Sequence, residues 1–104
     1  MSWFVLVLSG VLEAVWATAL GKSEGLSRLG PTVVFVAGMV ASMAGLAWAM
    51  RHLPVGTAYA VWVGIGAVLT VLYAVAAGEE LVSVMKIVFL VMIIAGVLGL
   101  KLAS

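Results

Sequence analysis

The stretch WFVLVLSGVLEAVWATAL, residues 3–20, decides the fold, because it holds one charged residue, Glu13, among apolar and small side chains. A helix needs about 20 mostly apolar residues to cross the roughly 30 Å hydrocarbon core of a bilayer. The start of the chain, Met1 and Ser2, lacks the basic residues of a signal peptide, and Glu13 would interrupt the apolar core of one. We therefore expect a transmembrane helix that is retained in the protein.

Three further apolar stretches follow in a chain of 104 residues. Hydrophobic residues make up 66% of the chain and charged residues 9%, whereas soluble domains contain about 25% charged residues. Pro31 and Pro54 each precede an apolar stretch, and the first turn of a helix tolerates a missing N–H group. The sequence therefore predicts an all-α membrane protein of four transmembrane helices in one transmembrane domain, residues 1–104. The expected spans are 3–20, 32–50, 55–77 and 84–102, and the last requires the Lys101 ammonium group to reach the membrane surface.

The basic residues are divided almost evenly between the two sides of the membrane. Arg51 and Lys101 fall on one side of the four spans, and the other side receives Lys22, Arg28 and Lys86. A clear excess of Lys and Arg on the cytoplasmic side normally sets the orientation. The near balance leaves open a weakly specified single orientation and insertion in both orientations. We predict the second, with antiparallel copies pairing as a dual-topology homodimer.

Size and small residues also favour a homodimer. Four helices are too few to enclose a solvated pathway, whereas transporters commonly form their site between two inverted halves. Gly96 and Gly99 in the last span let helices approach closely, which favours association in lipid. We predict that these glycines form the dimer packing surface; the alternative is that they reflect only the abundance of glycine in membrane helices.

Glu13 lies about halfway along the first span, so its carboxyl group is expected near the bilayer midplane. A charged side chain there costs from about 2.5 to more than 10 kcal/mol, and such residues mark ion or proton pathways. Loss of water and a second carboxylate nearby both favour the neutral form of a carboxyl group. We predict that Glu13 and its twin in the dimer bind either a proton or a small cation. The alternative is a protonated side chain that only links helices.

Helical spacing places aromatic and hydroxyl side chains at the depth of Glu13. Trp16 follows Glu13 by one helical turn, and Tyr59 and Trp62 are one turn apart in the third span. An indole N–H group can donate to a carboxylate, although plain aromatic packing is the alternative. Ser42 in the second span is expected either to orient Glu13 or to bond a carbonyl of its own helix. These residues are the predicted surroundings of the binding site.

A planar cation suits this combination of side chains. Aromatic faces attract cations, and the N–H fork of a guanidinium group pairs with two carboxylate oxygens at once. Gly64 and Gly66 in the third span are expected to form a conformational hinge, because glycine lowers the cost of non-helical geometry.

Several segments of the sequence form a recognisable set. They are the Glu13 span, Lys22-Ser23-Glu24-Gly25 with Arg28-Leu29 and Pro31, Pro54-Val55-Gly56-Thr57-Ala58-Tyr59-Ala60-Val61-Trp62, and Ala95-Gly96-Val97. Together they resemble the small multidrug resistance family over nearly the whole chain. Within that family, Glu13-Ala14-Val15-Trp16-Ala17 with Lys101 resembles the branch that exports guanidinium. Trp16 is the main difference from the branch that exports quaternary ammonium compounds.

The resemblance implies an antiparallel homodimer in the plasma (inner) membrane that exchanges protons for guanidinium. It implies that the two copies of Glu13 bind both proton and substrate and that the third helix bends to switch access. It also implies that the partners of Glu13 in the pocket are Trp16, Ser42, Tyr59 and Trp62.

The functional prediction is proton-coupled antiport of guanidinium and small monosubstituted guanidines, by alternating access around the Glu13 pair. The first alternative keeps the fold and exports quaternary ammonium or other hydrophobic cations. A cation channel is a second alternative, which the scarcity of polar residues in the spans disfavours. A non-transporting subunit of a heterodimer is a third, which the even charge distribution disfavours.

Other classes of function find no support in the sequence. The chain has no cysteine and one histidine, His52, which cannot hold a metal ion alone. It contains neither a nucleophile–base pair nor a phosphate-binding loop, so we predict that it is not an enzyme. We expect no cofactor and no nucleic-acid partner; the expected partners are the cation, protons, the lipid bilayer and a second copy of the chain.

Overall fold

A computed structural model describes residues 1–103, which form four helices. The helices are α1 (Ser2–Lys22), α2 (Leu29–Ala49), α3 (Val55–Ala76) and α4 (Val84–Ala103). Each is long and apolar enough to cross a membrane. The prediction of an all-helical chain with four membrane-capable helices is therefore confirmed.

Proline and glycine define several helix ends. Pro54 is the N-cap residue of α3, and Gly78, with a φ of +77°, follows the last turn of that helix in the left-handed conformation. α2 begins at Leu29, earlier than the expected residue 32. Pro31 thus lies in the first turn of α2, where backbone N–H groups have no carbonyl partner in the helix and the missing N–H costs nothing.

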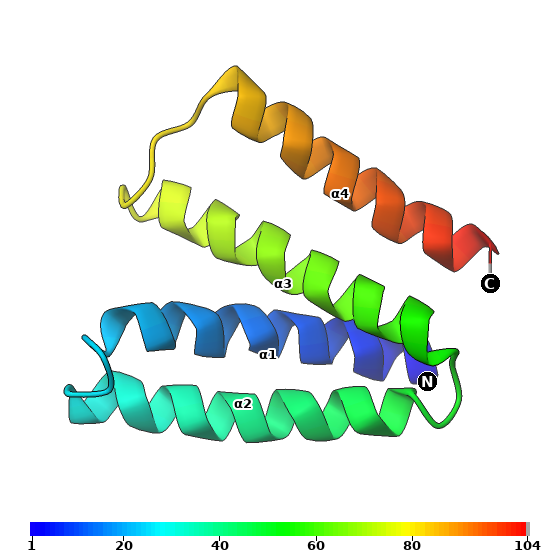
Figure 1. Ribbon diagram of the computed structural model, residues 1–104, viewed down its shortest axis with the longest axis horizontal. Helices are drawn as coiled ribbons and strands as arrows, with labels where there is room; N and C mark the ends of the chain where they lie inside the picture. Colours follow the sequence, from blue (N-terminus) through cyan, green and yellow to red (C-terminus); the bar gives the residue numbers. More distant parts are fainter. Residues whose placement is uncertain (104) are drawn as a thin grey trace.

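The four helices lie side by side in a thin slab. The chain measures 40 × 34 × 17 Å, so its shortest dimension is half of the next. α1 packs along both α2 and α3, whereas α4 packs mainly against α3 (Figure 1). One chain therefore has two broad faces.

The buried core lies where the first half of α1 meets the end of α2 and the start of α3. Its members are Leu6, Leu46, Ala49, Ala58, Val61 and Trp62. α4 contributes no buried residue. We call α1, α2 and α3 the three-helix unit, because these helices supply all the buried residues of the core, whereas α4 adds only the partly buried Val97 and Leu100 at its edge.

Close helix contacts in this unit depend on small residues. A Cβ atom at Gly10 of α1 would lie 2.9 Å from the Ile65 side chain of α3. A Cβ atom at Gly45 of α2 would overlap the Ser9 hydroxyl group of α1. Because lipid supplies no hydrophobic driving force between helices, such close backbone approach is a main source of their association.

The connection between α1 and α2, residues 23–28, is organised by the buried residue Ser23. Its hydroxyl group donates to the Leu20 carbonyl (2.7 Å) and accepts the Leu26 N–H (3.0 Å). Its carbonyl accepts the N–H groups of Ser27 and Arg28, both at 2.9 Å. Every partner in this network belongs to the connection itself or to the last turn of α1.

Candidate functional site

Glu13 lies near the middle of α1 and its carboxyl group faces α3. A Cβ atom at Gly66 of α3 would overlap the Glu13 carboxyl oxygen Oε1. Any side chain larger than that of glycine would therefore displace the carboxyl group from this place on α3. The absence of a side chain at Gly66 creates the space that the Glu13 carboxyl group occupies.

The Glu13 side chain forms no hydrogen bond or ion pair with any of residues 1–103. The ion pairs of the described chain are Lys22–Glu79 and Lys86–Glu80, and both involve the connection between α3 and α4. Acidic side chains within a membrane are normally paired or face an aqueous cavity. Glu13 is therefore an acceptor group near the middle of α1 without a counter-charge among residues 1–103.

Four aromatic rings form a row across the three helices beside Glu13. The Trp16 ring of α1 lies 5.8 Å from Phe35 of α2 at 62°, and 6.5 Å from Trp62 of α3 at 39°. The Tyr59 ring lies 5.9 Å from that of Trp62. Trp16 follows Glu13 by one turn on α1, and Trp62 precedes Gly66 by one turn on α3. The two indole-bearing residues thus lie one helical turn from Glu13 on α1 and from Gly66 on α3.

Ser42 connects the three helices through a short chain of hydrogen bonds. Its hydroxyl group donates to the Ser9 carbonyl of α1 (2.6 Å) and accepts the indole N–H of Trp62 (3.0 Å). Ser42 is fully buried and Trp62 is 5% exposed. These bonds fix the orientation of the Trp62 ring, since an indole has only one N–H donor.

The indole N–H of Trp16 is buried and has no hydrogen-bond partner among residues 1–103. A buried donor without a partner costs about 1–3 kcal/mol. The site therefore contains an unused acceptor, Glu13, and an unused donor, Trp16, one helical turn apart on α1.

The predicted site residues fall into two groups. The structure brings together Trp16, Ser42, Tyr59 and Trp62 through ring contacts and a hydrogen bond, and Glu13 contacts Gly66, one turn from Trp62. Ser42 bonds Ser9 and Trp62, rather than Glu13 or its own helix. The remaining predicted residues are glycines of α3 and α4.

These glycines have different surroundings. α3 is one continuous helix through Gly64 and Gly66. A Cβ atom at Gly64 would lie 2.6 Å from the Val97 side chain of α4, so this glycine serves the contact between α3 and α4. No heavy atom of the described chain lies within 4 Å of a Cβ position at Gly96 or Gly99, apart from their own helix and chain neighbours.

Two residues of the site were missed by the sequence reasoning. Ser9 supplies the carbonyl that Ser42 binds, and Phe35 contacts the edge of the Trp16 ring. Ser9 precedes Glu13 by one helical turn, so helical spacing contained a signal for it. Phe35 carried a weaker signal, as an aromatic residue two turns before Ser42 on the same helix.

A groove of about 570 Å³ lies on the opposite side of α1. Val11 and Val15 line it, and each is two positions from Glu13, which corresponds to about 200° of rotation around a helix. Glu13 and the aromatic row do not line this groove. The largest concavity described is therefore separate from the candidate site.

The candidate site has donors and acceptors for an organic cation rather than for a metal ion. Among residues 1–103, no three His, Asp or Glu side chains come together as metal ligands. The arrangement supplies one carboxyl group, two indole rings and a phenol, of which the rings attract cations through their faces.

Comparison with known proteins relates the chain to membrane exporters. A family model described as "Small Multidrug Resistance protein" matches residues 1–93. A protein named "Guanidinium exporter" from Escherichia coli (strain K12) is 50% identical over 104 residues, covering 100% of this chain and 99% of the relative. Proteins of the same name from Citrobacter freundii and Salmonella typhimurium are each 48% identical, with the same coverage.

The family match and the full-length relatives agree with the four membrane-capable helices, and the chain is a multi-pass protein of the inner (plasma) membrane. They also confirm the resemblance found in the sequence motifs. The chain belongs to the small multidrug resistance family.

Proposed function

We propose that this protein exports guanidinium and small monosubstituted guanidines in exchange for protons, and that Glu13 binds both. The observation that carries the proposal is the Glu13 carboxyl group, which lies midway along a membrane-capable helix, against Gly66, without a counter-charge among residues 1–103. Full-length relatives that are 48–50% identical and are named "Guanidinium exporter" support the choice of substrate.

The chemistry of the site suits a flat cation. Two N–H groups of guanidinium pair with the two oxygens of one carboxylate, which is a strong and directional interaction. The planar faces of the cation stack on indole rings more closely than a tetrahedral ammonium group does. The Ser42–Trp62 hydrogen bond holds one of these rings in place, so little orientation is lost when the cation binds.

Exchange follows from the use of one group for two ligands. A carboxyl group within the membrane is stable when it is protonated and when it is paired with a cation, and is costly when it is bare. Glu13 therefore binds either a proton or a cation. Movement of one of these ligands across the membrane then drives movement of the other in the opposite direction.

The complete transporter is proposed to be an antiparallel homodimer with two copies of Glu13. One chain is flattened, with a shortest dimension of 17 Å, and the second copy is proposed to cover the site. α4 contains no buried residue, and its Gly96 and Gly99 are open to a partner helix. Bending of α3 at Gly64 and Gly66 is the proposed means of switching access.

The proposal is tested by transport into proteoliposomes that contain the purified protein. Guanidinium and a tetraalkylammonium ion are supplied in separate experiments, and proton movement is followed with a pH-sensitive dye. We expect guanidinium uptake with opposite proton movement, and loss of both in Glu13→Gln. The matched control is Glu24→Gln, the same change at an exposed position between α1 and α2, which should transport normally.

Three results would overturn parts of this proposal. Transport of the tetraalkylammonium ion alone would assign the protein to drug export. Guanidinium flux without proton movement would indicate a channel. Equal activity of Glu13→Gln and Glu24→Gln would remove Glu13 from the mechanism.

A further inference from the structure

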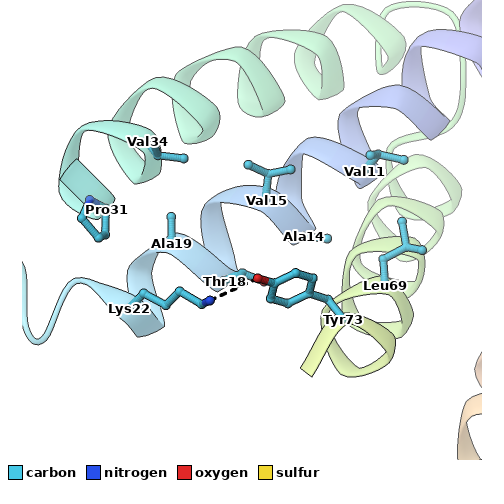
Figure 2. Close-up of a pocket in the computed structure, with 10 residues that line it drawn as sticks. All are labelled: Val11, Ala14, Val15, Thr18, Ala19, Lys22, Pro31, Val34, Leu69 and Tyr73. Atoms are coloured by element: carbon cyan, nitrogen blue, oxygen red, sulfur yellow. Dashed lines mark hydrogen bonds between the residues drawn. The ribbon is translucent and has the colours of Figure 1, made fainter. Parts of the chain in front are cut away.

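The groove on the side of α1 opposite Glu13 has the features of a second binding site. Figure 2 shows that its lining comes from three helices, with α1 between the side chains of α2 and those of α3. Most of its lining is aliphatic, including Val11, Val15, Val34 and Leu69. Val11, Val15 and Val34 are exposed in the chain, so the walls are open to the hydrocarbon of the membrane.

The groove has polar groups at one end only. Thr18, Lys22 and Tyr73 line this end, and Thr18 and Lys22 are one turn apart at the end of α1. The Lys22 ammonium group donates to the Tyr73 hydroxyl oxygen at 3.1 Å and lies 3.5 Å from the Glu79 carboxylate. An ammonium group has three N–H donors, so these contacts leave one for a further acceptor.

The length of the groove matches one leaflet of a bilayer. From Val11, near the middle of α1, to Lys22, at its end, the helix rises about 16 Å. Half of the hydrocarbon core measures about 15 Å. The aliphatic part of the groove thus extends from the bilayer centre, and its ammonium group lies at the depth of the lipid headgroups.

We propose that this groove binds one membrane phospholipid, with an acyl chain along the valine and leucine walls and the phosphate on the Lys22 ammonium group. The N–H donor of Lys22 that its Tyr73 and Glu79 contacts leave over is directed to a phosphate oxygen. The site does not depend on the transport activity proposed above.

The first test measures lipid bound to the purified protein by native mass spectrometry, with phosphatidylglycerol as the probe. Lys22→Gln should bind the lipid about two- to fivefold more weakly, the range expected for an exposed charge pair. The matched control is Lys86→Gln. Lys86 also pairs with a glutamate, Glu80, and is exposed to a similar extent (40% against 44% for Lys22), but it does not line the groove. An equal loss in both variants would mean nonspecific charge attraction and would overturn the proposal.

The second test fills the groove. Val15→Phe places a ring between its walls and should reduce phosphatidylglycerol binding at least as strongly as Lys22→Gln. Val36→Phe is the control, because Val36 is exposed to the same degree (46% against 44% for Val15) and does not line the groove. Unchanged lipid binding in Val15→Phe would overturn the proposal. If Val15→Phe instead became monomeric while it still bound phosphatidylglycerol, the groove would be an interface between copies of the chain.

Discussion

The three-helix unit and α4 differ in how much of their surface is used within one chain. Every helix of the unit has buried residues and contributes a side chain to the aromatic row beside Glu13. α4 has none buried and packs mainly against α3, with Val97 and Leu100 at the edge of the core and Lys101 over the Trp3 ring of α1. Contacts within one chain therefore build the candidate site, whereas most of the α4 surface is left to lipid or to another copy.

Two glycines of α3 show the same difference between contacts with the three-helix unit and contacts with α4. Gly66 makes room for the carboxyl group of Glu13 in the three-helix unit, and Gly64 makes room for Val97 of α4. They are two positions apart and so face roughly opposite sides of the helix. One glycine therefore serves the site and the other serves the attachment of α4.

The largest effect on stability is expected when one leucine in each region is truncated to alanine. Leu6 is fully buried and Leu98 of α4 is 58% exposed. Leu6→Ala should lower the free energy of unfolding by about 2–5 kcal/mol, because the cavity loses dispersion contacts on all sides. Leu98→Ala should lower it by less than about 0.5 kcal/mol, as at most surface positions. Denaturing-detergent titrations in mixed micelles measure both values.

Equal losses in the two leucine variants would contradict the division into a packed unit and an attached helix. A large loss in Leu98→Ala that disappears at high protein concentration would sharpen the division, because it would place α4 in the dimer interface.

The second prediction concerns the space beside Gly66 that the Glu13 carboxyl group occupies. In Gly66→Ala the added methyl group displaces the Glu13 carboxyl group, which is the flexible end of its side chain, so the helix should remain stable. Alanine favours a helix over glycine by about 0.5–1 kcal/mol. Guanidinium affinity should fall about tenfold or more, because a charged hydrogen bond contributes about 1.5–3 kcal/mol.

Gly56→Ala is the matched control on α3, because no heavy atom of residues 1–103 outside its own helix and chain neighbours lies within 4 Å of the new methyl position. Isothermal titration with guanidinium chloride compares the two variants. If both bind as the unchanged protein does, the contact between Gly66 and Glu13 has no role in binding.

The smallest effect is expected at the end of α4 that approaches α1. The Lys101 ammonium group lies 5.7 Å from the centre of the Trp3 ring. Lys101→Gln should lower the unfolding free energy by about 0.5–1 kcal/mol, the usual contribution of an exposed cation–π pair. A double-mutant cycle with Trp3→Leu isolates this contribution. A coupling energy of zero would show that the Lys101–Trp3 pair does not help to hold α4 to the unit.

The fold was largely predictable because the hydropathy pattern along the sequence marks where each helix begins and ends. Four apolar stretches separated by charges and two prolines gave the helices, and only the start of α2 differed noticeably, since Pro31 is accommodated within its first turn. The flat arrangement of the helices was not predictable. Periodicity defines the faces of each helix, but not which neighbour each face contacts.

The candidate site was predictable only in part for the same reason. Glu13 was evident as the one acidic residue inside a span, and Trp16 followed from helical spacing. The partners of Ser42 were not evident, because its bonds to Ser9 and Trp62 depend on the rotation of three helices about their axes. Sequence spacing could not distinguish a donor directed at Glu13 from one directed at a neighbouring hydroxyl group.

The connection around Ser23 has a consequence for biosynthesis. A ribosome adds about 5–20 residues per second, so α1 and α2 emerge seconds before α4. The hydroxyl and carbonyl groups of Ser23 find all their partners within residues 20–28. The first two helices can therefore enter the bilayer as a finished hairpin that needs no later segment to close its turn. Such a hairpin is equally complete whether its turn lies on the cytoplasmic or on the opposite side of the membrane.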